Sequence, residues 1–370
     1  MNQITNSKRL LTYIYLMNLY QLFFPRQKYK AIVYPTSVYS LFLYEMMELY
    51  KKEETLFIFR ELFAPFGRNI CPDYWEIKEV IKNYKLSRLH AYLISSIIWC
   101  LSRRYKNIPV YVNGGERHAR LFQLFFSHVI FLEDGLGNYL LRDPGPLAAL
   151  PKQKFRQRFI NPSFPPLGMD KKVRTIYLTG FLPVPAVVAP KVRLVSLKEL
   201  WENKTEVQRR EICSAYLPAD WESVLASGRE ILLLTQPWNE DCYTYPEKNF
   251  TDGDEIELYK TILEGYDEKQ VIIKTHPRER TDYRHFFPET LVIDTPTPME
   301  LFLLVGLKIK KAITVSSSSI HTFDDSVERV LLGTEITPKI KNETERRRKD
   351  YNGQVQWQDD SLVEKYDKGH

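Results

Sequence analysis

The sequence predicts an α/β protein made of two Rossmann-like domains that face a cleft. Three observations support this class. Short apolar runs alternate with helical patterns in both halves of the chain, a proline-rich stretch separates the halves, and 370 residues suffice for two domains. Because strands separated by helices form parallel sheets with crossover connections, we expect one parallel sheet per half. The predicted domains are 1–190 and 229–370, with a linker region at 191–228.

The first half is predicted from its alternating strand and helix patterns. The strand candidates are short apolar runs that end at turn residues, at 30–35, 55–60, 107–113, 129–132 and 174–178. Helical periodicity covers 38–50, 75–101 and 116–125. Proline then becomes frequent between about 144 and 189, where we place the transition between the domains.

The second half repeats the pattern. Its strand candidates are 230–235, 270–274, 291–293 and 311–315. Its helix candidates are 255–264, a segment that starts at Pro298, and a segment that follows the last strand and ends near Gly333.

Composition excludes several classes of protein. The chain is 44% hydrophobic with 15 glycines, which is incompatible with disorder or a collagen-like repeat. Its 52 basic and 46 acidic residues leave a net charge of +6, too diffuse to predict a nucleic-acid partner. The four cysteines lie far apart without CxxC spacing, so we expect neither a zinc site nor disulfides, and a cytoplasmic location.

An apolar and aromatic run from Leu10 to Phe24 follows two basic residues, as in a signal peptide, but no small-residue cleavage site comes after it. It is also shorter than the roughly 20 residues of a membrane span. Two interpretations stay open: a surface helix packed on its own domain, or an interfacial helix in peripheral contact with the inner face of the membrane. The basic tail at 339–349 is interpreted as a solvated face.

The first chemical motif is EDGLGN at 133–138, directly after the strand candidate 129–132. Ligands of parallel sheets bind at the carboxyl ends of strands, where Glu133 and Asp134 would stand. Neighbouring carboxylates raise each other's pKa, and Gly135 lets a substrate approach the backbone, so a general base is expected here. The alternative is a turn whose residues only satisfy backbone geometry.

The second motif is THPRE at 275–279, after the strand candidate 270–274. Pro277 fixes the backbone after His276, and Lys274 and Arg278 add positive charge, which favours an anionic ligand. His276 could stabilise a leaving phosphate, or it could be a structural histidine.

The third motif is a run of serines after the strand candidate 311–315, formed by Ser316, Ser317, Ser318 and Ser319. Hydroxyl and backbone N–H groups at a helix start can hold an anion without metal, but serine is equally an ordinary N-cap.

Together the motifs resemble a known family. Their order is similar to the pattern of bacterial sialyltransferases: an acidic pair before glycine, then His-Pro, and then serines 40 residues further on. EDGLGNY looks closest to the lipooligosaccharide sialyltransferases (glycosyltransferase family 52), which are related in motifs to capsular polysialyltransferases. Two Rossmann-like halves are also typical of the GT-B arrangement. The resemblance implies a GT-B enzyme that uses CMP-sialic acid as donor, with no metal and no further cofactor.

The resemblance also implies roles for individual residues. Asp134 matches the general base and Glu133 its neighbour. His276 matches the histidine that contacts the CMP phosphate, and Pro277 its partner. The serine run matches the phosphate-binding serines, with Ser317 and Ser318 favoured.

Further residues of the second half are weaker matches. Glu300 resembles a glutamate that binds the ribose of CMP, although Thr297 and Glu300 also have the spacing of a capping box. Thr235, Gln236 and Pro237 follow a strand candidate where the nucleotide pocket of the family begins. A DxD sequence at 252–254 suits a helix cap better than a metal site.

These observations predict a metal-independent inverting sialyltransferase whose partners are CMP-sialic acid and an oligosaccharide acceptor of a bacterial surface glycan, with galactose as its terminal sugar. Three alternatives stay open: a capsular polysialyltransferase, another CMP-releasing transferase with a CDP-linked donor, and a non-catalytic module that binds nucleotide or glycan. The sequence leaves the oligomeric state open, including a homodimer.

Overall fold

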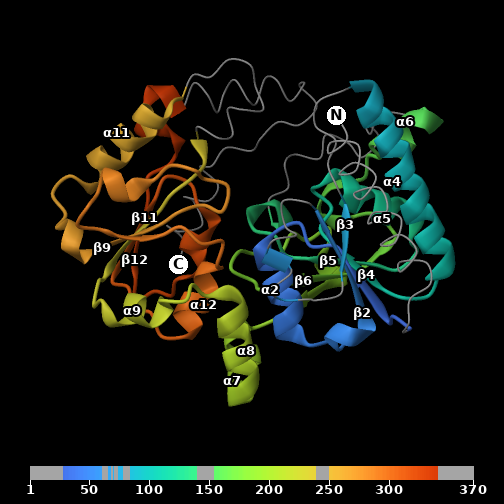
Figure 1. Cartoon of the computed structure of the whole chain (residues 1–370), viewed down its shortest axis with the longest axis horizontal. Helices are drawn as coiled ribbons and strands as arrows, with labels where there is room; N and C mark the ends of the chain where they lie inside the picture. The colour runs from blue at the N-terminus through green and yellow to red at the C-terminus, as the bar shows by residue number, and fades with distance from the viewer. Residues whose placement is uncertain are drawn as a thin grey trace, which may run out of the picture. The chain divides into compact units, whose positions relative to one another are not determined.

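The computed structural model describes residues 28–60, 66–67, 70, 74–77, 84–139, 154–238 and 250–340. They form two compact units, each with one parallel sheet (Figure 1). The first unit contains the described residues up to Tyr139, those of 154–180, and Val184–Ser196. The second contains Phe181–Pro183 and the chain from Leu197 onward. The apolar run at 10–24 and the tail beyond 340 lie outside the described residues.

The sheet of the first unit has seven strands in the order β3-β2-β1-β4-β5-β6-β7. The strands are β1 (Ala31–Val33), β2 (Thr55–Arg60), β3 (Tyr74–Ile77), β4 (Val110–Val112), β5 (Val129–Leu132), β6 (Val173–Leu178) and β7 (Val192–Leu194). All neighbours are parallel, and β1 pairs with both β2 and β4. The strand order therefore reverses between β1 and β4, the place where open α/β sheets bind ligands at their carboxyl edge.

The helices of this unit are α2 (Val38–Met47), α4 (Tyr84–Arg104), α5 (Arg117–Phe125) and α6 (Phe155–Ile160), with short 3₁₀ turns at Lys52–Glu54, Leu136–Asn138, Pro166–Gly168 and Ala189–Lys191. Side chains cap two of the helices: the Ser37 hydroxyl accepts the backbone N–H of Ser40 at the start of α2, and Glu116 accepts the N–H groups of His118 and Ala119 at the start of α5.

The second sheet has five parallel strands in the order β10-β9-β8-β11-β12. The strands are β8 (Ile231–Leu234), β9 (Val271–Lys274), β10 (Leu291–Ile293), β11 (Lys311–Thr314) and β12 (Glu328–Leu331). The helices are α7 (Leu197–Glu202), α8 (Glu206–Tyr216), α9 (Trp221–Ala226), α11 (Asp252–Leu263) and α12 (Met299–Leu304), with 3₁₀ turns at Glu268–Gln270, Tyr283–His285, Ser318–Thr322 and Thr334–Ile336.

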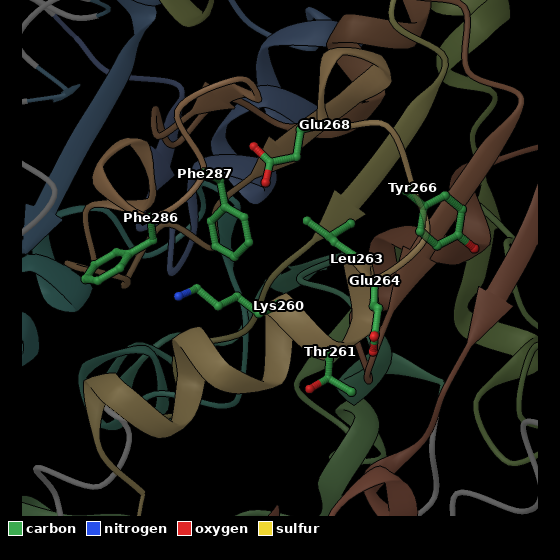
Figure 2. A pocket seen from close by; sticks show the side chains of 8 residues that line it. All are labelled: Lys260, Thr261, Leu263, Glu264, Tyr266, Glu268, Phe286 and Phe287. Carbon is green, nitrogen blue, oxygen red and sulfur yellow. The ribbon is translucent and has the colours of Figure 1, made fainter.

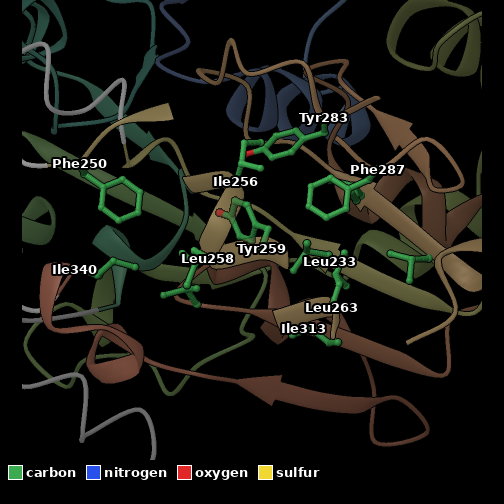
Figure 3. Packing of buried hydrophobic residues seen from close by; sticks show 13 residues of the cluster. Leu233, Phe250, Ile256, Leu258, Tyr259, Leu263, Tyr283, Phe287, Ile313 and Ile340 are labelled. Atoms are coloured by element: carbon green, nitrogen blue, oxygen red, sulfur yellow. The ribbon is translucent and has the colours of Figure 1, made fainter. Parts of the chain in front are cut away.

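A hydrophobic core holds α11 against the second sheet (Figure 3). Ile256, Tyr259 and Leu263 recur at helical spacing on α11 and pack with strand residues such as Leu233 and Ile313. All five of these side chains are buried. The packing of α11 against the sheet therefore fixes the positions of β8, β9 and β11.

The predicted α/β class with parallel sheets is confirmed, but three segments differ from the sequence predictions. The helix predicted for 75–101 begins only at Tyr84, because residues 74–77 alternate in burial with a period of two and form β3. The helix predicted to end near Gly333 is instead the turn Ser318–Thr322 followed by β12. Asp324 caps a turn between them by accepting hydrogen bonds from the N–H and hydroxyl of Ser326.

The predicted linker region 191–228 is also corrected. Its first residues form β7, which pairs with β6 and belongs to the first sheet. The rest forms α7, α8 and α9, which belong to the second unit. The division between units thus follows Ser196 rather than residue 190.

Candidate active site

Asp134 stands just beyond the carboxyl end of β5, and solvent reaches its side chain. Its Oδ2 accepts a hydrogen bond of 2.9 Å from the hydroxyl of Thr36, in the loop between β1 and α2. Packing of protein around the carboxyl group raises its pKa, hydrogen bonds from Ser37 and Thr36 oppose that rise, and the Glu133 carboxylate adds to it. Asp134 is thus an oriented, accessible carboxylate, as a general base requires.

Glu133, by contrast, is fully buried. Oε1 accepts hydrogen bonds from the hydroxyls of Tyr39 (2.9 Å) and Thr179 (2.8 Å). Oε2 accepts the Tyr139 hydroxyl and the Thr179 backbone N–H, both at 2.5 Å. Burial raises the pKa of Glu133, while these four donors favour its charged form. Glu133 therefore joins α2, β5 and β6 beneath Asp134, and its position is that of a positioning residue rather than a catalytic one.

Two asparagines and a glycine shape the turn after Asp134. The Asn138 side-chain oxygen accepts the backbone N–H of Asp134 at 2.7 Å and the Asn113 side-chain amide at 3.3 Å. Gly135 has a φ of 108°, which strains any residue with a Cβ atom. The chain can therefore turn sharply and expose Asp134 instead of continuing β5.

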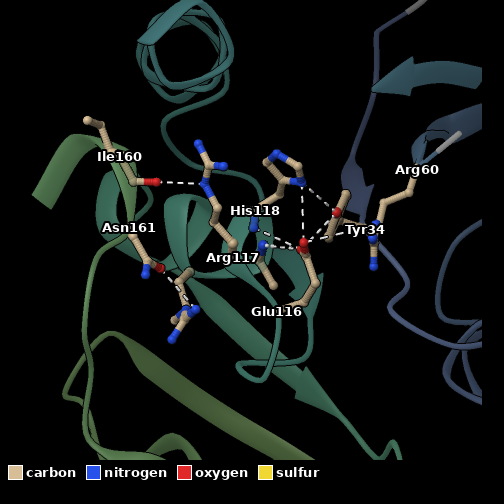
Figure 4. Close-up of polar contacts among 9 residues, drawn as sticks. Tyr34, Arg60, Glu116, Arg117, His118, Ile160 and Asn161 are labelled. Atoms are coloured by element: carbon tan, nitrogen blue, oxygen red, sulfur yellow. Dashed lines mark hydrogen bonds and ion pairs between the residues drawn. The ribbon is translucent and has the colours of Figure 1, made fainter. Parts of the chain in front are cut away.

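A second polar cluster, around Glu116, lies at the same sheet edge (Figure 4). Glu116 accepts the Tyr34 hydroxyl at 2.9 Å, and its other carboxylate oxygen lies 3.3 Å from His118 Nδ1 and 4.0 Å from Arg60. Burial would raise the pKa of Glu116, but the partners, led by His118, hold it near 2. Since Tyr34 and Thr36 share one loop, this cluster fixes the loop that holds Asp134.

In the second unit, His276 follows the end of β9 and is partly buried. Its Nδ1 accepts the backbone N–H of Arg278 at 3.2 Å, so the ring proton resides on Nε2. Burial lowers the pKa of His276 to about 3, and the positive charges of Arg278 and Lys274 contribute. His276 is therefore a neutral imidazole at pH 7 that can donate one hydrogen bond through Nε2.

Glu279 fastens the segment 275–279 to β8. One of its oxygens accepts the backbone N–H of His276 at 3.0 Å and the hydroxyl of Thr235, at the end of β8. The ends of β8 and β9 thus hold His276 jointly. Pro277 lies exposed between His276 and this anchor.

Lys274 does not extend toward a ligand. Its side chain is buried, and Nζ donates to the backbone carbonyls of Thr275 and Thr295, each at 2.9 Å. Burial lowers the pKa of Lys274 to about 8, against the attraction of Glu279 and Glu300. The lysine contributes positive charge beneath His276, but its hydrogen bonds are to the backbone.

The serine run leaves β11 at the same edge. Ser317 is buried, and its N–H bonds the Thr314 hydroxyl at 3.0 Å, which in turn donates to the Leu234 carbonyl. The other three, Ser316, Ser318 and Ser319, are partly exposed. No side chain caps the turn Ser318–Thr322, so the N-cap alternative for these hydroxyls is not realised. The turn is also a five-residue 3₁₀ segment, which makes hydroxyls more important here than a helix dipole.

The remaining predicted residues of this unit lie nearby with different exposures. Gln236 is partly exposed and Pro237 is buried. Glu300 is in the first turn of α12. The capping box proposed for it is not formed, because the N-cap is Pro298 and the Thr297 hydroxyl donates to the Tyr216 carbonyl.

The DxD sequence belongs to a helix cap. Thr251 and Asp254 form the capping box of α11, and Asp254 also pairs with Lys339 at 2.5 Å. Among the residues that the structure describes, no group of three or more His, Cys, Asp or Glu side chains could hold a metal ion.

A pocket of about 380 Å³ in the second unit lies away from these residues (Figure 2). Its lining comes from the end of α11, the turn before β9, and Phe286 and Phe287. The end of α11 and the turn precede β9, and Phe286 and Phe287 precede β10 (Leu291–Ile293), whereas His276 follows β9. This pocket therefore lies toward the opposite edge of the sheet.

Sequence reasoning placed the three motifs correctly at strand ends but missed the residues that hold them. The missed residues are Thr36, Ser37, Tyr39, Tyr139 and Thr179 around the acidic pair, and Thr314 below the serines. Glu279 belongs to the THPRE motif, but the sequence predicted no role for it. The position of Thr36, Ser37 and Thr179, directly after strand candidates, was the signal that they would reach the ligand-binding edge.

Comparison with known proteins identifies the family of the chain. The profile of glycosyltransferase family 52 matches residues 78–339. An uncharacterized protein of Haemophilus influenzae is 32% identical over 294 residues, which cover 78% of this chain and 89% of that protein. Among the helices described, none has the length and apolar character needed to cross a bilayer.

Solved structures share the fold. A GT-B domain of a sialyltransferase from Photobacterium damselae superposes with a TM-score of 0.50 at 10% identity, over 81% of this chain and 90% of that chain. A second sialyltransferase structure from the same species superposes with a TM-score of 0.50 at 10% identity, over 84% of this chain and 78% of that chain. The chain therefore belongs to glycosyltransferase family 52, as its motifs indicated, and is a glycosyltransferase with the GT-B fold.

Proposed function

We propose that this protein is an inverting sialyltransferase that moves sialic acid from CMP-sialic acid to the terminal galactose of a bacterial surface glycan such as lipooligosaccharide or capsule. The observation that carries the proposal is the accessible Asp134 carboxylate, oriented by Thr36 and Ser37 at the carboxyl edge of a parallel sheet. Membership in family 52 supports transfer of sialic acid in general.

The acceptor step uses Asp134 as general base. Its carboxylate removes the proton of an acceptor hydroxyl while that oxygen attacks the anomeric carbon of the donor sugar. A raised pKa makes the carboxylate a better proton acceptor, and the hydrogen bond from Thr36 keeps it aimed. Glu133 holds the turn from below without touching the substrates.

The leaving-group step uses groups of the second unit. As the bond from the anomeric carbon to the CMP oxygen breaks, charge develops on the phosphate. His276 would donate its Nε2–H to a phosphate oxygen, and the partly exposed hydroxyls of the serine run would add further donors. A neutral imidazole with a pKa of about 3 fits a hydrogen-bond donor rather than a proton donor to CMP. These donors would stabilise the leaving group without a metal ion.

The experiment measures CMP release from CMP-sialic acid, with lactose as acceptor and excess EDTA, for the wild type and Asp134→Asn. The amide preserves the shape of the side chain and removes its basicity. We expect release in EDTA by the wild type, and a fall of at least a hundredfold in kcat for the variant with little change in donor affinity. The control is Glu53→Gln, an exposed carboxylate of the first unit, which should retain full activity.

Three results would overturn parts of this proposal. Turnover close to wild type in Asp134→Asn would remove the base assignment. Absence of release from the wild type with lactose and with a sialylated acceptor would redirect the donor to a CDP-linked compound. A loss of activity on adding EDTA, restored by a divalent cation, would contradict metal independence.

A further inference from the structure

A hollow of about 440 Å³ opens at the amino edge of the first sheet, the edge opposite to Asp134. Its lining consists of Lys106, Asn107, Ser127, His128 and Arg174. They come from the segment before β4, the segment before β5, and the start of β6, three strands that are neighbours in the sheet. The hollow is thus built by tertiary structure from three separate stretches of chain.

All five lining residues have a polar or basic side chain, and none of them is a carboxylate. Three of the five side chains are bases, and the other two offer a hydroxyl and an amide. Within the part of the chain that the structure describes, no hydrogen bond or ion pair engages any of these five side chains. Among the described residues, the bases of the hollow therefore have no carboxylate partner.

Neighbouring lysines show that this is a local property of the hollow. Lys172 donates to the carbonyls of Gln123 and Leu124, and Lys191 donates to three carbonyls of the turn at 168–170. Asp170, the nearby carboxylate, acts on these two lysines. The Asp170 carboxylate and these backbone carbonyls therefore interact with Lys172 and Lys191 rather than with the bases of the hollow.

Within the hollow, the positive charge of Arg174 acts on His128. Burial and the positive charge of Arg174 lower the pKa of His128, and Arg174 acts in the same sense on Lys191. A bound anion would relieve this repulsion. Guanidinium, ammonium, hydroxyl and amide donors that converge on one volume are the groups that hold phosphate oxygens in proteins.

We propose that this hollow is a binding site for a phosphate group, separate from the donor site of the second unit. Its volume exceeds that of one phosphate and its mouth is open, so the group can be part of a larger molecule. The phosphate of a soluble metabolite and that of an anionic lipid headgroup share this chemistry.

The test compares two double variants that lose the same charge. Lys106→Ala/Arg174→Ala removes both strong bases of the hollow. Lys51→Ala/Arg193→Ala removes two exposed bases of the same unit that lie outside it. Titration calorimetry with inorganic phosphate, at constant ionic strength adjusted with chloride, measures the first source. Co-sedimentation with phosphatidylcholine vesicles, with and without phosphatidylglycerol, measures the second, and circular dichroism verifies folding.

We expect the hollow variant to bind at least tenfold more weakly than the wild type, while the control variant binds like the wild type. Loss of phosphate binding alone would identify a soluble ligand, and loss of vesicle binding alone would identify a lipid headgroup. Either loss supports the site. Equal binding by both folded variants, or binding by the wild type to neither phosphate nor vesicles, would overturn it. The donor site contributes equally to all three proteins, so its failure would not alter the comparison.

Discussion

Replacing Thr36 by Val tests whether the loop between β1 and α2 aims the carboxylate of Asp134. Val has nearly the shape of Thr but lacks the hydroxyl that donates to Asp134 Oδ2 at 2.9 Å. The substitution therefore removes one hydrogen bond from the proposed base and leaves the buried packing of the loop intact. The matched control is Thr36→Ser, which retains the hydroxyl.

The expected magnitude follows from the environment of this hydrogen bond. A hydrogen bond to a charged group contributes about 1.5–3 kcal/mol in a protected place. Because solvent reaches Asp134 and Ser37 also holds it, about 1 kcal/mol is appropriate. Loss of that energy reduces the population of the aimed carboxylate about fivefold. We expect kcat to fall by about this factor with an unchanged KM for the donor.

The pH dependence gives a second, independent readout. The Thr36 hydrogen bond favours charged Asp134, so its loss raises the pKa of Asp134 further. Activity needs the charged form, and the acid limb of the kcat profile should therefore move to higher pH in Thr36→Val but not in Thr36→Ser. CMP release measured from pH 5 to pH 8 tests both expectations. Unchanged kcat together with an unmoved acid limb would refute the orienting role of the loop.

Three further predictions concern the supports of the site. Glu133→Gln should lower the free energy of unfolding by about 2 kcal/mol, because the amide oxygen of Gln can accept only two of the four hydrogen bonds that the Glu133 carboxylate accepts. An unchanged urea midpoint would contradict this hydrogen-bond network. Gly135→Ala should lose about 1 kcal/mol or more of stability, and also activity, because the φ of Gly135 is 108°. Gly137→Ala in the same turn is the control, since an added Cβ there meets no atom within 4 Å and should be tolerated. Equal urea midpoints for the two variants would argue against strain at Gly135. Between pH 7 and 5 the wild type should lose about 2 kcal/mol more stability than His276→Gln. The reason is that the unfolded imidazole takes up a proton and the folded one, with a pKa of about 3, does not; parallel pH curves would disprove that low value.

The elements that the sequence predicted well are those with a strong local pattern. The strands β2, β5, β9 and β10 are continuous apolar runs, and buried parallel strands require such runs. The errors fall where the local pattern is ambiguous. The sequence pattern predicted a helix through residues 328–331, whereas parallel pairing with β11 makes them the strand β12.

The roles of the motif residues divide in the same way. The sequence by itself determined that Asp134, His276 and the serine run lie at the carboxyl ends of parallel strands, because strand direction and connection follow from local pattern and handedness. It could not determine that Glu133 is buried beneath Asp134, or that Lys274 donates to backbone carbonyls.

Only the tertiary structure decided which groups hold the catalytic candidates. Thr36 and Asp134 are 98 positions apart in the chain, and Thr235 and Glu279 are 44 apart. No periodicity spans such distances. Burial and hydrogen-bond partners arise when separate strands pair side by side, so the supports of this site, and the basic hollow at the opposite edge, exist only in the folded chain.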